Sequence, residues 1–254
     1  MSVPQVAQSR RERRLAERAA RRDARGQPRK SGFGPGLGRL SVLGLLGGLA
    51  VIALAIAFGA RPTSPATYPT TVTTARVPSG LAMDGFALGR AEAPVTIDIY
   101  EDFQCPACEA WGQNVFPSLA ANELANGTAR VVFHDMAFLG PESTDAGRAA
   151  YAASRQGRFW DMWATLYSNQ GRENSGAFSR VRLIAMADQL GLDAKRFEAD
   201  MDSGAAQAAI DASRSDAARA GVTSTPTLII DGQRVVGAQT YADVAAAISA
   251  ASAR

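Results

Sequence analysis

The chain of 254 residues contains two cysteines, Cys105 and Cys108, which lie three positions apart. A strand-like run at residues 95–100 precedes the pair, and a helix-like run at residues 109–116 follows it. A thiol at such a junction lies at a helix N-terminus, where unpaired backbone N–H groups and the helix dipole favour the thiolate. Because the thiolate is the nucleophile of disulfide exchange, the position of the pair predicts redox chemistry. A Cys-x-x-Cys pair can also bind a metal or form a structural disulfide.

Charge is distributed unevenly along the chain. Residues 1–39 contain 11 of the 27 Lys and Arg residues and 3 of the 24 Asp and Glu residues, so this arm carries a net charge of +8 and the rest −5. A basic arm can bind nucleic acid, but the segment that follows it points to a membrane. Residues 40–60 contain no charged side chain. At about 1.5 Å per residue they can span a hydrocarbon core of about 30 Å, and we predict a transmembrane helix there.

The arginines lie on the N-terminal side of this segment, so the positive-inside rule places residues 1–39 in the cytoplasm. Cleavage at the small-x-small sequence Ala55-Ile56-Ala57 is the alternative, but the apolar run and the charged region before it are long for a signal peptide. We therefore expect an uncleaved anchor in a bacterial cell membrane, with the catalytic domain periplasmic or at the cell surface. Residues 61–83, rich in Pro, Thr, Ser and Ala, are expected to form an extended tether.

The expected compartment is oxidising, so disulfides persist there. Secreted proteins that need structural disulfides usually have several cysteines at scattered spacings, whereas this chain has one closely spaced pair. A disulfide that closes a loop of four residues adds little stability. A catalytic pair therefore explains the cysteines better than a stabilising one.

The pattern of apolar residues predicts a small α/β domain at residues 84–254 with a helical insertion at about 138–221. Strand, helix and strand in succession imply a parallel pair, and Pro117 should kink or break the intervening helix. The aromatic stripe at 159–170 is expected to be core rather than a cofactor cage. Strands are expected at 95–100, 129–134, 227–231 and 234–236, the last two joined by a turn at Gly232-Gln233; helices are expected at 106–126, 145–156, 159–170, 179–190, 193–202, 205–220 and 241–251.

Thr225 and Pro226 immediately precede a predicted strand, and an X–Pro bond at such a place is a candidate cis peptide. Together with the cysteine pair, this arrangement resembles the thioredoxin superfamily, and more closely its DsbA-like branch, which includes membrane-tethered DsbA and BdbD types. The stretches that carry the resemblance are residues 88–97, 101–108, 157–162, 221–227 and 235–239.

The resemblance implies a thioredoxin-like fold with an inserted helical subdomain, and an enzyme that forms disulfides in exported proteins. Cys105 would be the exposed attacking thiolate and Cys108 the buried resolving thiol, with Pro106-Ala107 between them. The redox-active Cys105–Cys108 disulfide would serve in place of any bound cofactor or metal.

The same resemblance implies that Pro226 holds a loop beside Cys105, and that the backbone of Thr225 pairs with an extended substrate. The implied partners are cysteine-containing exported proteins and a membrane redox partner of the DsbB or VKOR kind, which would reoxidise the enzyme. The membrane would be reached through the N-terminal helix, and no nucleic-acid partner is expected.

The sequence departs from the family pattern at two places. Strongly oxidising members often have histidine where this chain has Ala107, so the helix N-terminus should supply most of the thiolate stabilisation. We expect the pKa of Cys105 to lie below about 8.5 without reaching the extreme of the family. A buried acid is also common six residues before the first cysteine, where this chain has Ile99. Negative charge at Glu101 or Asp102 would raise a thiol pKa.

Other functions are less well supported by the sequence. A reductase or isomerase of the same fold, or a thioredoxin-like module that holds copper or a client without turnover, are the alternatives. His134 is the single histidine and, with one cysteine pair, does not complete a zinc site of four ligands unless a dimer shares one. The spacing of His134, Ser143 and Asp145 does not indicate a hydrolase, and no glycine-rich phosphate loop is present.

Overall fold

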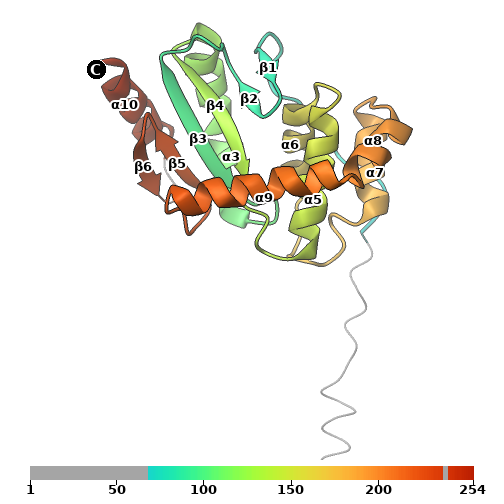
Figure 1. The fold of residues 1–254 in the computed structure, drawn as a ribbon. Helices are drawn as coiled ribbons and strands as arrows, with labels where there is room; N and C mark the ends of the chain where they lie inside the picture. Colours follow the sequence, from blue (N-terminus) through green and yellow to red (C-terminus); the bar gives the residue numbers. More distant parts are fainter. Residues whose placement is uncertain (1–67, 237–239) are drawn as a thin grey trace, which may run out of the picture. The chain divides into compact units, whose positions relative to one another are not determined.

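The structure is a computed structural model, which describes residues 68–236 and 240–254 (Figure 1). The predicted cytoplasmic tail and the transmembrane segment at 40–60 lie outside the described residues. Within the described ranges, no helix has both the length and the apolar character needed to cross a bilayer.

A mixed sheet of six strands forms the centre of the fold, in the order β1-β2-β4-β3-β5-β6. The long central strands β3 and β4 pair in parallel, which confirms the predicted parallel pair, and every other neighbouring pair is antiparallel. The strands are β1 (Met83–Asp84), β2 (Ala87–Leu88), β3 (Val95–Glu101), β4 (Ala129–Asp135), β5 (Thr227–Ile230) and β6 (Gln233–Val236).

Helices follow the predicted pattern closely, and five of them, α5 to α9, form the insertion between β4 and β5 (Figure 1). The break that Pro117 was expected to cause is confirmed, because α3 ends at Asn114 and α4 begins at Phe116. The helical elements are α3 (Pro106–Asn114), α4 (Phe116–Leu119), the π-helix η1 (Ala120–Leu124), α5 (Pro141–Ser154), α6 (Phe159–Ser168), α7 (Arg180–Gln189), α8 (Ala194–Met201), α9 (Gly204–Arg219) and α10 (Tyr241–Ser252).

Local sequence signals account for the starts of several helices. Asp193 caps α8, as predicted, by accepting a hydrogen bond from the backbone N–H of Arg196 at 2.9 Å. Helix α5 begins at Pro141, four residues before the predicted start, because a proline in the first turn already has the φ angle of a helix and needs no N–H partner there.

The β5–β6 hairpin turns one residue earlier than predicted. Its two central residues are Asp231 and Gly232, with φ of +48° and +79°, and Ile230 pairs with Gln233 across the turn. Positive φ at both positions is typical of the tight turns that match the twist of a hairpin, and Asp-Gly is a favoured sequence for them. The turn is therefore Asp231-Gly232, and the prediction of Gly232-Gln233 was wrong.

Residues 61–83 were predicted to form an extended tether. The part that the structure describes, residues 68–83, instead packs against the helical insertion. Val72 and Val77 are buried. The backbone N–H of Ala75 donates to Thr165 Oγ1 at 3.2 Å, and the Thr165 hydroxyl donates to the Ala75 carbonyl at 3.0 Å. An extended segment can bury isolated side chains without showing a periodic apolar face, so the sequence pattern did not indicate this packing.

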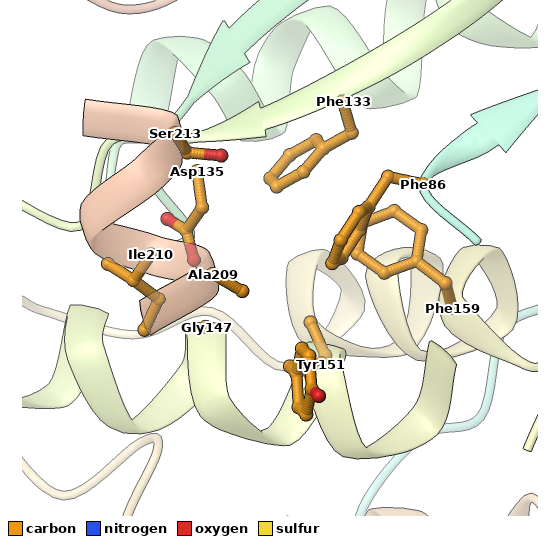
Figure 2. Close-up of a pocket in the computed structure, with 10 residues that line it drawn as sticks. Phe86, Phe133, Asp135, Gly147, Tyr151, Phe159, Ala209, Ile210 and Ser213 are labelled. Atoms are coloured by element: carbon orange, nitrogen blue, oxygen red, sulfur yellow. The ribbon is translucent and has the colours of Figure 1, made fainter. Parts of the chain in front are cut away.

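Helix α5 approaches β4 at Gly147, which faces the buried side chain of Asp135 (Figure 2). A Cβ atom at Gly147 would lie 2.0 Å from Asp135 Oδ2. We expect Gly147→Ala to lower the free energy of unfolding by about 1–3 kcal/mol, because the clash outweighs the helix propensity of alanine. Unfolding in urea measures the free energy of unfolding of this variant and of the wild type. Gly204→Ala is the matched control, since a Cβ there meets nothing within 4 Å; equal stabilities of the two variants would contradict the close contact.

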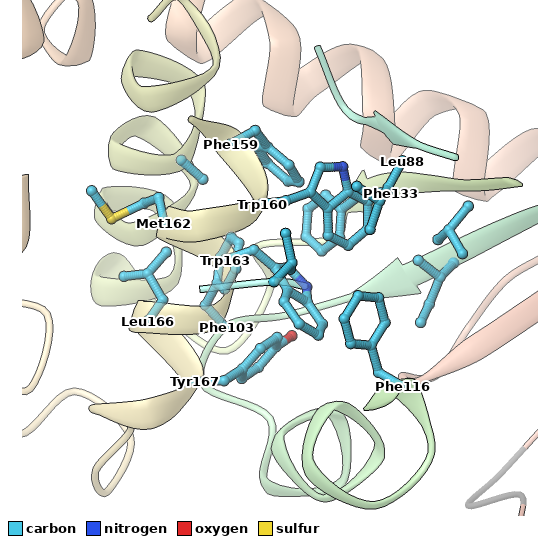
Figure 3. Close-up of a cluster of buried hydrophobic side chains, with 14 of the residues drawn as sticks. Leu88, Phe103, Phe116, Phe133, Phe159, Trp160, Met162, Trp163, Leu166 and Tyr167 are labelled. Carbon is cyan, nitrogen blue, oxygen red and sulfur yellow. The ribbon is translucent and has the colours of Figure 1, made fainter. Parts of the chain in front are cut away.

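The aromatic stripe of α6 forms the core between the insertion and the sheet, as predicted (Figure 3). Phe159 and Trp160 are buried, and the ring centroid of Phe159 lies 5.1 Å from that of Phe133 on β4. The ring of Trp163 lies 4.7 Å from Phe116 on α4. Aromatic pairs at these separations stabilise a core beyond the area that they bury. Helix α6 is thereby fixed beside the end of β3, where the cysteine pair begins.

Candidate functional site

Cys105 is the N-cap residue of α3, and Pro106 occupies the first turn. The strand β3 ends at Glu101, so the cysteine pair follows the strand after a short turn. The Cys105 carbonyl accepts hydrogen bonds from the backbone N–H groups of Cys108 and Glu109, both at 3.1 Å. The predicted position of the first cysteine at a helix N-terminus is confirmed.

Both cysteines are free thiols in this structure. Cys105 is 8% exposed, whereas Cys108 is fully buried. The Sγ atom of Cys105 lies 3.6 Å from the carbonyl oxygen of Thr225, and the Thr225–Pro226 peptide is cis. The fold therefore brings the Thr225-Pro226 loop against Cys105. It also corrects one expectation: Cys105 is the more accessible thiol, but this loop and its neighbours cover most of it.

The pKa of the Cys105 thiol is lowered from 9.0 to about 6. Hydrogen bonding from the Cys108 thiol is the largest cause, and burial opposes it. Thr225 and the backbone N–H groups of Cys108 and Ala107 lower the pKa further. The expectation of a pKa below about 8.5 is confirmed, but the cause differs from the expectation, because the neighbouring thiol contributes more than the backbone at the helix start.

Cys108 has the opposite character. Burial raises the pKa of its thiol well above the ordinary value, and hydrogen bonding to Cys105 raises it further. At neutral pH the pair therefore consists of a Cys105 thiolate that accepts a hydrogen bond and a Cys108 thiol that donates one. This division suits one sulfur for exchange with external disulfides and the other for holding a proton.

Glu101, at the end of β3, is fully buried. Its Oε2 atom accepts hydrogen bonds from Trp163 Nε1 at 2.9 Å and from the Tyr167 hydroxyl at 3.2 Å. Burial raises the pKa of this carboxyl to about 8 despite these two donors. At pH 7 Glu101 is therefore mostly protonated. The sequence suggested a negative charge near the thiols, and at Glu101 the structure largely removes that charge.

Asp102 holds the turn between β3 and Cys105. Its Oδ1 accepts hydrogen bonds from the backbone N–H of Gln104 at 2.8 Å and from the Ser143 hydroxyl at 2.7 Å. Its Oδ2 accepts from the backbone N–H groups of Phe138 and Leu139 at 2.8 and 3.0 Å. Four donors satisfy this buried carboxylate. Ser143 thus ties the start of α5 to the turn before the cysteines, which is a structural contact.

Comparison with known proteins places the chain in a family. Residues 82–250 match the model of a family described as Thioredoxin. The chain belongs to the thioredoxin family. This confirms the resemblance that the cysteine pair and the Thr225-Pro226 loop indicated.

Relatives of this thioredoxin-family chain include two kinds of protein. A probable disulfide bond formation protein D from Bacillus cereus is 25% identical over 151 residues, which cover 58% of this chain and 69% of the relative. A Na(+)/H(+) antiporter NhaA from Herminiimonas arsenicoxydans is 32% identical over 162 residues, which cover 64% of this chain. The chain spans 25% of the length of that antiporter.

Among solved structures, oxidised BdbD from Bacillus subtilis superposes with a TM-score of 0.63 at 17% sequence identity, over 72% of this chain and 99% of that one. This likeness shows a shared thioredoxin-like α/β fold with a helical insertion. In this thioredoxin-like domain the strand β3, the helix α3 and the loop before β5 together position the cysteine pair and Thr225-Pro226.

His134 lies apart from this arrangement. Its Nε2 atom is 2.8 Å from Asp98 Oδ1, and its ring stacks on Tyr100 with centroids 4.4 Å apart. Strand alternation directs Tyr100 and Glu101 to opposite faces of β3, so this cluster and the carboxyl of Glu101 lie on different faces of the sheet. Across residues 68–236 and 240–254, no group of three or more potential metal-binding side chains gathers at one place.

Two features of the site escaped the sequence reasoning. The aromatic stripe of α6 was assigned to the core alone, yet Trp163 and Tyr167 also hydrogen-bond Glu101. The strand pattern placed Glu101 beside the cysteines without indicating that it would be fully enclosed. A buried Trp or Tyr normally needs a partner for its N–H or O–H group, and this is the signal that points from α6 to a nearby acceptor.

Proposed function

We propose that this protein is a thiol–disulfide oxidoreductase of the DsbA type that transfers the Cys105–Cys108 disulfide to cysteine-containing exported proteins. The observation that carries the proposal is the position of Cys105 at the N-terminus of α3 and against the Thr225 loop, with the fully buried Cys108 one turn along. The lowered pKa of Cys105 and the raised pKa of Cys108 agree with this arrangement. The relatives named disulfide bond formation protein D support it.

The first step begins from the oxidised pair. A client thiolate attacks Cys105 Sγ, a mixed disulfide between client and Cys105 forms, and the bond to Cys108 breaks. Cys108 leaves with the electron pair and takes up a proton, which its raised pKa favours. Attack is directed to Cys105 because Cys108 is fully buried.

The second step releases the client. A second client thiolate attacks the client sulfur of the mixed disulfide, a client disulfide forms, and Cys105 leaves as a thiolate. A thiol of low pKa is the better leaving group, so the pKa of about 6 favours this step. Two electrons have then moved from the client to the cysteine pair, which another protein must remove.

The Thr225-Pro226 loop is the proposed client contact. The Thr225 carbonyl lies 3.6 Å from Cys105 Sγ, so a client chain bonded to Cys105 would pass directly beside this backbone. Extended client residues could pair with the main chain of Thr225 in the manner of an added strand. Such pairing uses backbone groups and accommodates clients of varied sequence.

We further propose that the domain works outside the cytoplasm, attached to a bacterial membrane through residues 40–60. The uncharged segment and the basic arm before it support this placement. A membrane protein of the DsbB or VKOR kind would accept the two electrons left after each turnover.

A reaction of the isolated protein with a reduced client tests the function. The oxidised full-length protein is mixed with an unfolded polypeptide that contains two cysteines, the mixture is quenched with acid, and the free thiols of the client and of the protein are counted separately. We expect one client disulfide for each Cys105–Cys108 disulfide consumed, and none with the Cys105→Ser variant. Client thiols that remain unchanged in the presence of the oxidised wild-type protein would reject the proposal.

A further inference from the structure

The loop between α6 and α7, residues 169–179, reaches the backbone on both sides of Gln104. Gln170 Nε2 donates to the carbonyl oxygen of Phe103 at 2.8 Å and to that of Cys105 at 3.1 Å. One side-chain amide therefore connects the two backbone carbonyls that flank Gln104 in the turn that leads into α3. Gln170 is distant from Cys105 in the sequence, and the exchange steps described above do not use it.

The Cys105 carbonyl is also the acceptor for the first turn of α3, through the N–H groups of Cys108 and Glu109. Fixing this carbonyl fixes the orientation of the peptide units that follow it. The backbone N–H groups of Ala107 and Cys108 belong to those units, and they lower the pKa of Cys105. The Gln170 amide thus acts on the same backbone turn that stabilises the thiolate.

The same loop holds Gln104 independently. Gln104 is 2% exposed, and its Oε1 atom accepts the backbone N–H of Asn174 at 2.6 Å. Its Nε2 atom donates to the Ser143 hydroxyl at 2.9 Å. A Cβ atom at Gly140 would lie 2.4 Å from the Asn174 side chain, so the loop fits closely against the start of α5.

The chain segment before β1 contacts this loop at a further point. The Tyr68 hydroxyl lies 3.1 Å from Ser175 Oγ and accepts the backbone N–H of Arg172 at 3.3 Å. A Cβ atom at Gly171 would lie 2.2 Å from the same hydroxyl. Contacts with the active-site turn and with the segment at Tyr68 therefore hold the loop in one arrangement, which a positioning element requires.

From these contacts we infer that Gln170 is a positioning residue for Cys105, acting through the carbonyls of Phe103 and Cys105. The inference rests on the proposed function and deepens it, because it assigns part of the thiolate stabilisation to the inserted helical subdomain. A thioredoxin-like domain without this loop would lack the contact.

Titration of Cys105 in the full-length reduced protein tests the inference. The thiolate is followed by its absorbance at 240 nm and by the pH profile of alkylation. For Gln170→Ala we expect the pKa of Cys105 to rise by roughly 0.5–1. For Gln170→Glu, which keeps the shape but replaces the donor with an acceptor, we expect a rise at least as large.

Gln156→Ala is the matched control. The Gln156 side-chain amide lies in the same insertion and also hydrogen-bonds the main chain. It accepts from the Asp193 N–H at 2.9 Å and donates to the Asp193 carbonyl at 3.2 Å. We expect this variant to lower Tm without changing the pKa of Cys105.

The inference would be overturned if the Gln170 variants kept the wild-type pKa of Cys105 and showed only a lower Tm, as expected for Gln156→Ala. These readouts need no client. If the wild-type protein fails to oxidise clients, the proposed function is rejected. The role of Gln170 is decided separately, by the change in the pKa of Cys105.

Discussion

Replacing Cys108 with alanine is expected to raise the pKa of Cys105 by about 1–2, from its value of about 6. The Cys108 thiol makes the largest contribution to that low pKa, and a hydrogen bond to a charged group is worth about 1.5–3 kcal/mol. The same variant cannot form the intramolecular disulfide, so oxidation of clients should fall by at least about 100-fold. Absorbance at 240 nm, recorded against pH, measures the first effect.

Cys108→Ser separates the two roles of this residue. Serine keeps a hydroxyl donor in the buried position but has no sulfur for exchange. We therefore expect this variant to hold the pKa of Cys105 closer to 6 than alanine does, while client oxidation is lost to the same extent. An unchanged pKa in the alanine variant would show that the backbone of α3 stabilises the thiolate without help from Cys108.

The second large effect concerns Glu101 and the pH dependence of stability. The pKa of this carboxyl is raised from 4.5 in an exposed chain to about 8 in the folded protein. Between pH 4.5 and pH 8 the folded state keeps the Glu101 proton, which the unfolded state has released. The free energy of unfolding that Glu101 contributes is therefore fully present below pH 4.5 and is lost as pH rises through 8. The difference corresponds to about 5 kcal/mol.

The prediction is clearest for the oxidised protein, in which Cys105 does not titrate. We expect its free energy of unfolding, measured in urea from pH 5 to pH 8, to fall with rising pH, and to fall much less in Glu101→Gln. Glutamine keeps an acceptor for Trp163 and Tyr167 but does not titrate. The difference between the two proteins isolates Glu101 from Asp135, whose buried carboxyl also has a raised pKa.

Glu101→Ala supplies the control for the hydrogen bonds. It leaves the buried donors of Trp163 and Tyr167 without their acceptor, which should lower stability by about 1–3 kcal/mol at every pH. Parallel pH curves for wild type and Glu101→Gln would mean that Glu101 is ionised in the folded protein. In the reduced protein the lowered pKa of Cys105 acts in the opposite direction, because stability is then gained as pH rises from about 6 to 9.

Features governed by neighbouring residues could be predicted from the sequence. The strand before Cys105, the helix after it and the break at Pro117 follow from local pattern and backbone chemistry. The hairpin prediction missed by one residue although Asp231-Gly232 carries a recognised turn signal.

Features that depend on contacts between distant segments could not be predicted in this way. Gln170 was predicted as the last residue of the helix at 159–170 and lies just beyond the end of α6, and nothing in its neighbours shows that its amide meets the Cys105 carbonyl. Strand alternation assigns Glu101 to a face of β3, but its burial and raised pKa follow from the position of α6. Likewise, Val72 and Val77 are buried by a surface that only the folded insertion provides.

The pKa of Cys105 limits how strongly the thiolate alone can drive oxidation. Lowering it from 9.0 to about 6 stabilises the reduced protein at pH 7 by about 1.4 kcal/mol, which corresponds to about 30 mV. Ala107, which lies between the two cysteines, contributes no side-chain hydrogen-bond donor to the Cys105 thiolate. The remainder of any oxidising potential must come from other differences between the disulfide and dithiol forms.

The reduction potential of the Cys105–Cys108 pair decides whether the protein donates disulfides or reduces them. The full-length protein is equilibrated at pH 7 with glutathione buffers of known ratio, quenched with acid, and its disulfide fraction is measured. Protein oxidants of this superfamily have potentials near −120 mV and reductants near −270 mV. A disulfide donor to exported proteins should have a potential less negative than about −250 mV. A value at or below about −250 mV would identify the protein as a reductant and reject the proposed oxidation of clients.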